Sequence, residues 1–256
     1  MNRAETYFER GFAFDGRGKS IEAILNFSRA IELNPEYARA YYHRGSVYFD
    51  LHRYLDAIRD FDKTIELNPN FSSAYFNRGQ AYFELKKYVE AVADFSTGLE
   101  LNPEAVVAYN NRGCAYQKLE QYDEAIEDFS QLIELSPTFV PAYNNRGNAY
   151  LSLNRFSDAI RDFDRVIELN PNNANAYFNR GNAFMCLKNF VDAIRNYDRA
   201  VELDPNYSSV YINRGFAYCE LGNLTEAVTN YEQALEVEPN NPVALKNLNI
   251  LRGENI

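Results

Sequence analysis

The chain has 256 residues, of which 46% are hydrophobic, and a formal net charge of −10 at neutral pH. The acidic balance argues against nucleic acid or an anionic membrane surface as a partner, and no apolar run is long enough to span a bilayer. Cys114, Cys186 and Cys219 are an odd, sparse set without metal-ligand spacing, which favours reduced thiols in a cytoplasmic protein.

A unit of 34 residues repeats seven times without a change of register. Each copy contains an Arg-Gly pair, the first at Arg10-Gly11 and the last at Arg214-Gly215, and a proline follows each pair at a fixed distance. The copies span residues 4–37, 38–71, 72–105, 106–139, 140–173, 174–207 and 208–241. A fixed period of this length is typical of an array in which each unit buries its apolar face against the next. We therefore expect residues 1–256 to form one elongated domain.

The spacing of apolar residues predicts two helices in every copy. In the fifth copy they are expected near residues 140–153 and 157–169. Pro171 ends the second helix, because a proline disfavours helical backbone at the residue before it, here Asn170. Residues 242–256, which open with an Asn-Pro pair typical of a helix start, are expected to form a closing helix.

Small residues indicate where the two helices of a copy meet. Gly147 and Ala159 have counterparts in every copy, and an aromatic residue, Phe163 in the fifth copy, is expected to fill the space beside them. Glycine in the middle of a helix costs about 1 kcal/mol, so its return in all copies indicates a packing requirement.

This arrangement resembles the tetratricopeptide repeat family, whose pattern has Gly, an aromatic residue three positions later, then Ala, an aromatic residue and Pro. Two positions depart from the family: its usual Trp is Tyr in every copy, and its Leu before Gly is Arg. The resemblance covers residues 4–241. It implies an all-α fold, a right-handed superhelical solenoid of antiparallel helix pairs whose first helices line a concave groove, with residues 242–256 as a capping helix.

The arginine before each glycine is expected beside the seam between repeats, where a desolvated guanidinium needs a partner. We expect it to pair with an acid on the second helix. The candidate acids are Asp60, Asp94, Asp128, Asp162, Asp198 and Glu232. A row of phosphate-binding arginines is the functional alternative.

At about 100° per residue, one stripe of each first helix is left over once both packing seams are assigned. It lies six and two residues before the glycine and one and five residues after it, and we expect it to line the groove. Two residues before the glycine, the first two copies have Glu9 and His43, and the other five copies have asparagine. These asparagines are Asn77, Asn111, Asn145, Asn179 and Asn213.

We interpret the five residues as an asparagine ladder, because a carboxamide can both donate to and accept from a backbone amide of an extended peptide. Some superhelical members of the resembled family, including the substrate-binding part of a nucleocytoplasmic glycosyltransferase, use asparagines at this place in this way. The alternatives are that duplication copied a surface residue or that each asparagine bonds a neighbouring repeat. Asn144, Asn148, Asn182 and Phe178 are expected to shape specificity. Half-burial against the adjacent repeat is the alternative for Asn144 and Phe178, which stand three residues before the glycine.

No catalytic, metal or cofactor site is expected. Residues 13–20 formally fit a loose P-loop pattern, but they are expected to form the turn between two helices, without the strand that a P-loop follows. His43 and His52 have no cluster of Cys or acids at ligand spacing around them. No Ser-His-Asp or Cys-His arrangement is visible.

The first functional hypothesis is therefore a non-enzymatic scaffold that holds an extended partner segment in its groove. A chaperone-tail adaptor with a carboxylate clamp is a second, although only Arg39 fits one of the basic positions of that clamp. A substrate-recognition subunit of a larger enzyme complex is a third. Self-association through Leu245, Leu248 and Leu251 is also open.

Overall fold

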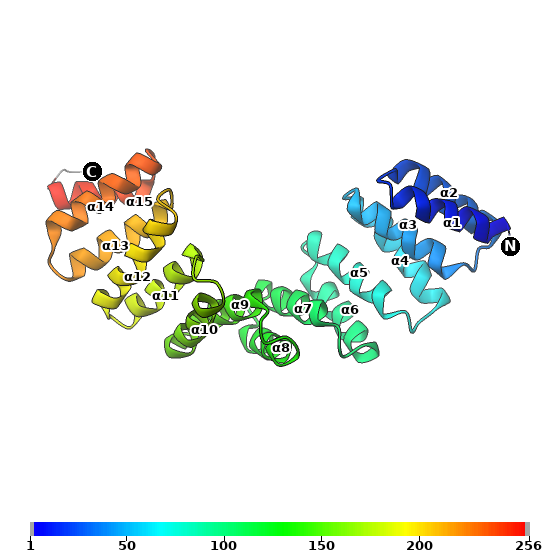
Figure 1. Ribbon diagram of the computed structural model, residues 1–256, viewed down its shortest axis with the longest axis horizontal. Coiled ribbons are helices and arrows are strands. Elements are labelled where there is room, and N and C mark those ends of the chain that lie inside the picture. The colour runs from blue at the N-terminus through cyan, green and yellow to red at the C-terminus, as the bar shows by residue number, and fades with distance from the viewer. Residues whose placement is uncertain (1–2, 254–256) are drawn as a thin grey trace. The chain divides into compact units, whose positions relative to one another are not determined.

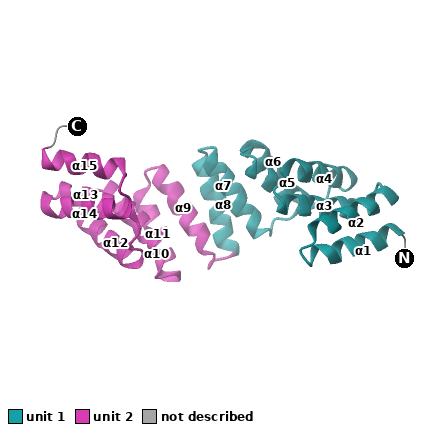
Figure 2. Cartoon of the chain, turned by 90° about the horizontal axis from the view of Figure 1, so that it is seen from above, with its two compact units in different colours: residues 1–135 teal, residues 136–256 magenta. Residues whose placement is uncertain are grey.

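The structure is a computed structural model that describes residues 3–253. Within this range the chain forms fifteen α-helices and no strand, which confirms the all-α prediction. The helices fall into two compact units, residues 1–135 and 136–256, coloured teal and magenta in Figure 2. The assignment of the whole chain to one continuous domain stays a prediction.

The first unit contains eight helices in sequential pairs (Figure 1). Their bounds are α1 Arg3–Asp15, α2 Ser20–Leu33, α3 Ala38–Asp50, α4 Tyr54–Leu67, α5 Ser72–Glu84, α6 Tyr88–Leu101, α7 Val106–Lys118 and α8 Tyr122–Leu135. The two helices of a copy pack against each other, and the second helix of each of the first three copies also packs against the first helix of the next.

The second unit contains seven helices. Their bounds are α9 Val140–Ser152, α10 Phe156–Leu169, α11 Ala174–Cys186, α12 Phe190–Leu203, α13 Ser208–Glu220, α14 Leu224–Val237 and α15 Pro242–Arg252. Helices α9 and α10 match the expected bounds within one residue at each end. The last helix begins as expected, with the Asn241 side chain accepting hydrogen bonds from two backbone N–H groups. It ends earlier than expected, at Arg252, because Gly253 has left-handed backbone with φ 71°. The last expected residues, 254–256, lie outside the described residues.

The second helices stop where the prolines require it. Asn170 has φ −141° and ψ 87°, which is extended backbone ahead of Pro171. Its side-chain Oδ1 accepts a hydrogen bond of 3.3 Å from the backbone N–H of Asn172. The turn between these repeats is therefore stabilised locally, by Pro171 and by the hydrogen bond between Asn170 and Asn172.

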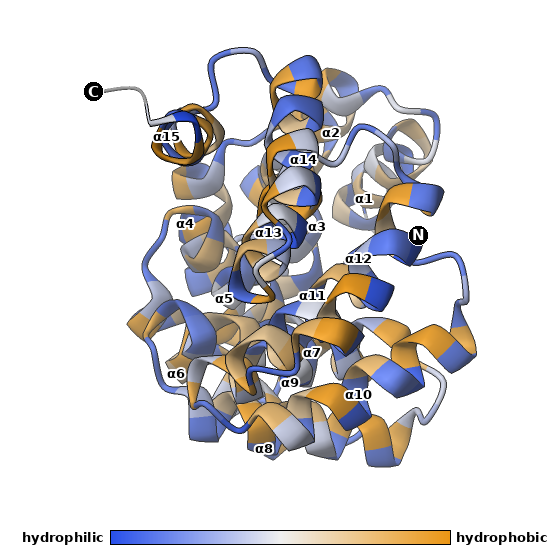
Figure 3. Ribbon diagram, turned by 90° about the vertical axis from the view of Figure 1, so that its left-hand side faces the viewer, coloured by the Kyte–Doolittle hydropathy of each residue, from blue (hydrophilic) through white to orange (hydrophobic). Residues whose placement is uncertain are grey.

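The helices are amphipathic, and hydrophobic and hydrophilic residues alternate along most of them in Figure 3. In the fifth copy Ala159 and Phe163 are fully buried. A Cβ atom added to Gly147 would lie 2.8 Å from Cε1 of Phe163, closer than two carbons can approach without displacement. The glycine thus provides the space for the aromatic ring, as the sequence pattern predicted.

The two helices of each copy are joined by a tight turn with one residue in the left-handed backbone region. These residues are Gly18, His52, Lys86, Glu120, Asn154, Lys188 and Gly222. At Gly18 the turn is closed by hydrogen bonds from Gly18 N to Asp15 O (2.8 Å) and from Lys19 N to Phe14 O (3.0 Å). Residues 13–20 are consequently an inter-helix turn, as expected, whose amides at Gly18 and Lys19 are already used.

None of the helices between residues 3 and 253 is both long enough and apolar enough to cross a membrane.

Candidate functional site

The predicted ladder residues occupy equivalent places on five first helices. Asn77 lies on α5, Asn111 on α7, Asn145 on α9, Asn179 on α11 and Asn213 on α13, and each is half-buried. The first two belong to the first unit and the other three to the second.

Within each unit the amino group of a ladder asparagine donates to the preceding repeat. Asn111 Nδ2 donates to Gln80 Oε1 at 2.8 Å, and Asn213 Nδ2 donates to Asn182 Oδ1 at 2.8 Å. Asn77 Nδ2 contacts Tyr42 Oη at 3.1 Å and Ser46 Oγ at 3.4 Å, and Asn179 Nδ2 donates to Asn148 Oδ1 at 3.1 Å. All four preceding repeats contribute the residue one position after their glycine. For these amino groups, the alternative of a bond to a neighbouring repeat is therefore the correct one.

The carbonyl ends of the same carboxamides are in part available. Among residues 3–253, Oδ1 of Asn77 and Oδ1 of Asn179 accept no hydrogen bond. Neither oxygen is among the buried polar atoms that lack a partner. Oδ1 of Asn111 accepts a long bond of 3.4 Å from Asn110. Because the amino group fixes the orientation of each carboxamide, the group that can face a ligand is an acceptor.

The residues expected to shape specificity have diverse surroundings. Asn148 and Asn182 are the acceptors that orient the ladder residues of the following repeats. The ring of Phe178 packs against Tyr207, with centroids 4.9 Å apart, as in the alternative of half-burial. Asn144 is half-buried, and its Oδ1 is buried without a hydrogen-bond partner among the described residues.

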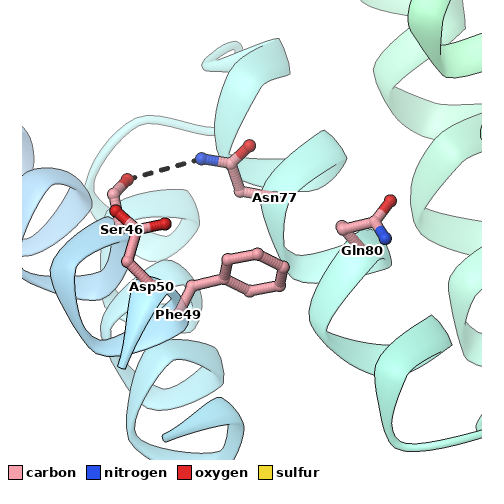
Figure 4. Close-up of a pocket in the computed structure, with 5 residues that line it drawn as sticks. All are labelled: Ser46, Phe49, Asp50, Asn77 and Gln80. Atoms are coloured by element: carbon pink, nitrogen blue, oxygen red, sulfur yellow. Dashed lines mark hydrogen bonds between the residues drawn. The ribbon is translucent and has the colours of Figure 1, made fainter. Parts of the chain in front are cut away.

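Cavities open beside the ladder in both units. Between α3 and α5 a cavity of about 230 Å³ is lined by Ser46, Phe49, Asp50, Asn77 and Gln80 (Figure 4). A second cavity, of about 450 Å³, adjoins both Asn77 and Asn111. In the other unit a cavity of about 250 Å³ adjoins Asn213. Cavities therefore adjoin three of the ladder asparagines, Asn77, Asn111 and Asn213.

Sequence reasoning did not single out Phe49 and Asp50. Asp50 stands five residues after Gly45, on the stripe that was expected to line the groove. The signal that could have identified Asp50 is its place in the last turn of a helix. An acid there is unfavourable because its charge opposes the helix dipole.

In copies two to five the arginine before the glycine pairs with the second helix of its own copy. Arg44 donates from Nε and Nη2 to the two carboxylate oxygens of Asp60, each at 2.7 Å. The same two-bond pairing joins Arg78 to Asp94, Arg112 to Asp128 and Arg146 to Asp162. These four aspartates are buried. Burial raises the pKa of Asp60, and Arg44 lowers it again only in part. The predicted pairs are confirmed for these four copies.

The expected acids of the last two copies, Asp198 and Glu232, were assigned to the wrong arginines. Arg180 donates from Nε to Asn196 at 2.7 Å, and Asp198 instead accepts from Arg214 of the following repeat at 2.7 Å. Glu232 pairs with Arg252 on α15. The residue that faces an arginine lies 16 positions after it, whereas Asp198 and Glu232 lie 18 positions after theirs. Side chains two positions apart on a helix point in different directions, so a residue 18 positions after the arginine does not face it.

Five of these guanidinium groups also reach the second helix of the preceding repeat within the same unit. Arg44 donates to Ser28 at 2.9 Å and Arg112 to Ser96 at 3.0 Å. The preceding partner is an aspartate for the other three: Asp62 for Arg78, Asp164 for Arg180 and Asp198 for Arg214. Each of these five arginines is thus paired with at least one carboxylate. These five arginines serve structure, which argues against a phosphate-binding row.

Comparison with known proteins identifies the family to which these repeats belong. The family model described as tetratricopeptide repeat matches residues 38–71, 72–104, 106–139, 140–173, 174–207 and 208–241, and a TPR repeat model matches residues 17–52. No curated protein matches the chain.

Solved structures similar to the chain include two at 26% identity. One is MamA, with a TM-score of 0.62 over 66% of this chain and 92% of MamA. The other is YrrB, described as a TPR protein with an unusual peptide-binding site, with a TM-score of 0.61 over 73% of this chain and 96% of YrrB. The C-terminal part of a TPR repeat-containing protein from Cytophaga hutchinsonii has 18% identity and a TM-score of 0.81 over 94% of this chain and 99% of that one, a likeness in fold.

Proposed function

Because this chain belongs to the tetratricopeptide repeat family, we propose that it is a non-enzymatic scaffold whose first helices bind an extended segment of a partner protein. A similar protein, YrrB, is described as having a peptide-binding site, which supports a peptide as the ligand.

The observation that carries the proposal is the set of oriented carboxamides at one place of successive repeats. Asn77 and Asn179 each hold their amino group against the preceding repeat, which leaves Oδ1 able to accept a backbone N–H. Repeats about 10 Å apart and an extended peptide rising about 3.3 Å per residue match one rung to about three peptide residues. Main-chain recognition of this kind supplies affinity, and the adjoining cavities would supply specificity.

A random library of 12-residue peptides, selected against the purified full chain, tests the proposal. Replacing Asn77, Asn179 and Asn213 by alanine together should weaken a selected peptide by at least about tenfold, because each lost hydrogen bond is worth about 1 kcal/mol. The matched control replaces three exposed glutamates of the second helices, Glu66, Glu168 and Glu202, by alanine, and should leave affinity unchanged.

The ladder alanines also remove bonds between repeats, so circular dichroism must show that the variant is folded at the temperature of the binding assay. An undiminished affinity in the folded triple variant would exclude the ladder from binding. Failure to select any peptide would exclude the proposed function as a whole.

A further inference from the structure

The cavity between α3 and α5 has a lining that selects the charge of its occupant. Ser46, Phe49 and Asp50 come from α3, and Asn77 and Gln80 come from α5, with the five side chains arranged around the opening in Figure 4. Four of them stand on the stripe two residues before, or one or five residues after, their glycine.

The amide and hydroxyl groups that line this cavity already donate to other residues. Asn77 Nδ2 contacts Tyr42 and Ser46, the Ser46 hydroxyl donates to the Tyr42 carbonyl at 3.1 Å, and Gln80 Nε2 donates to Glu84 at 3.0 Å. Among residues 3–253 the Asp50 carboxylate and Asn77 Oδ1 accept no hydrogen bond, and both groups are acceptors. An occupant that satisfies them must donate.

The charge around the cavity is also uncompensated. Asp50 ends α3, where the helix dipole is negative, and Asp15 and Glu84 end α1 and α5 in the same way. None of these three helices has a basic residue in its last turn. Asp50 forms no ion pair within residues 3–253, and the pKa of Asp15 is raised by burial and then by the nearby Asp50. A cation in this cavity would be attracted by both the carboxylates and the helix ends.

Phe49 adds an aromatic wall. Its ring projects from α3 between Asp50 and the side chains of α5 (Figure 4). An ammonium or guanidinium group is attracted to the face of such a ring, while the aliphatic part of a lysine or arginine side chain packs against apolar surface.

The equivalent cavity of the second unit shows that the fold does not require an acid here. Four repeats later the same places are occupied by Asn182, Met185, Cys186, Asn213 and Phe216, and these residues line the cavity of about 250 Å³. Cys186 replaces Asp50 and Phe216 replaces Gln80, so this lining is largely apolar. The same structural position therefore has different chemistry in the two units.

Building on the proposed function, we propose that the bound segment places a lysine or arginine side chain in the cavity between α3 and α5, with its charged end at Asp50 and its stem beside Phe49. The chain would thus select, among extended segments, those with a basic residue at one position.

Selection of the 12-residue library against three forms of the full chain tests this inference. Wild type should return peptides with Lys or Arg at one aligned position, and Asp50→Asn should lose that preference. The matched control is Glu220→Gln, which neutralises the equivalent residue of the last repeat and should keep the preference. Asp50 is exposed and its charge opposes the helix dipole, so Asp50→Asn should melt at a temperature no lower than that of wild type.

A second measurement compares two peptides. One is a peptide selected with wild type that has arginine at the basic position, and the other is its copy with citrulline, a neutral isostere of arginine, at that position. Wild type should bind the citrulline peptide about tenfold more weakly, and Asp50→Asn should bind the two peptides equally. A basic preference that persists in Asp50→Asn, or peptides that bind with no basic position, would overturn this inference alone. If no peptide binds, the proposed function itself fails.

Discussion

The bridging arginines lead to a prediction about Asp128, the partner of Arg112. Among residues 3–253, Arg112 pairs with one carboxylate, that of Asp128, and also donates to Ser96 on the preceding second helix. Arg78 instead has two, on Asp94 and Asp62. Asp128→Asn should therefore leave a half-buried guanidinium without an anion, whereas Asp94→Asn should leave Arg78 paired.

The magnitudes follow from the burial of the pair. Breaking a buried ion pair by removal of one partner costs about 3–5 kcal/mol. The Arg112 side chain is 19% exposed, and an asparagine at this place still accepts a bond, as Asn196 does from Arg180. We therefore expect about 2–3 kcal/mol for Asp128→Asn and about 1 kcal/mol for Asp94→Asn.

The last two repeats supply the design of a rescue. There the residue 16 positions after the arginine is asparagine and the residue 16 positions before it is aspartate. Adding Ser96→Asp to Asp128→Asn copies that arrangement, and the double variant should recover most of the lost stability.

Urea unfolding followed by circular dichroism measures the free energy of unfolding of the three variants and of wild type. Hydrogen exchange of residues 106–135 shows whether the loss of stability is local to α7 and α8. Equal costs for Asp128→Asn and Asp94→Asn, or a double variant no more stable than Asp128→Asn, would refute the reasoning that each arginine requires one carboxylate from either side.

Three further outcomes are expected. Gly147→Ala should destabilise the second unit by about 1–3 kcal/mol because the new methyl group overlaps the Phe163 ring, and thermal melting should show a smaller cost when Phe163→Leu is already present. Lys86→Gly should raise the free energy of unfolding by up to about 1 kcal/mol, because Lys86 has φ 60°, whereas Gly222→Ala should lower it. Burial, and then Arg39, lower the pKa of His43 from its usual 6.5, so the unfolded chain binds the proton more readily and stability should fall as pH decreases below 6.5; His43→Asn should reduce this slope in melts between pH 5 and 7.5.

The helix pairs could be predicted from sequence because their signals are local and repeat in register. The expected second helix of the fifth copy ends at residue 169, and α10 ends at Leu169 because Pro171 sets the backbone of Asn170. The contact of Gly147 with Phe163 was likewise predictable, since one missing side chain and one large one recur at fixed places.

The partners of polar side chains were harder to predict because they depend on which helices face each other between repeats. The hydrogen bond from Asn111 to Gln80 joins residues 31 positions apart, and no local pattern indicates it. Asp198 was matched to its own repeat, although it faces the arginine of the following one. The cavity at Asp50 also depends on inter-repeat geometry, since its lining comes from two repeats.

The shared arginine contacts mean that the repeats, although alike in sequence, are not interchangeable modules. In the described part of the chain, the only carboxylate that pairs with Arg180 is that of Asp164, which belongs to the copy before it. Grafting residues 174–207 directly behind residues 4–37 would place Arg180 between Ser28 and Asn196, with no negative charge on either side. Recombination of such arrays, natural or engineered, must therefore preserve the pairing across each junction as well as the 34-residue register.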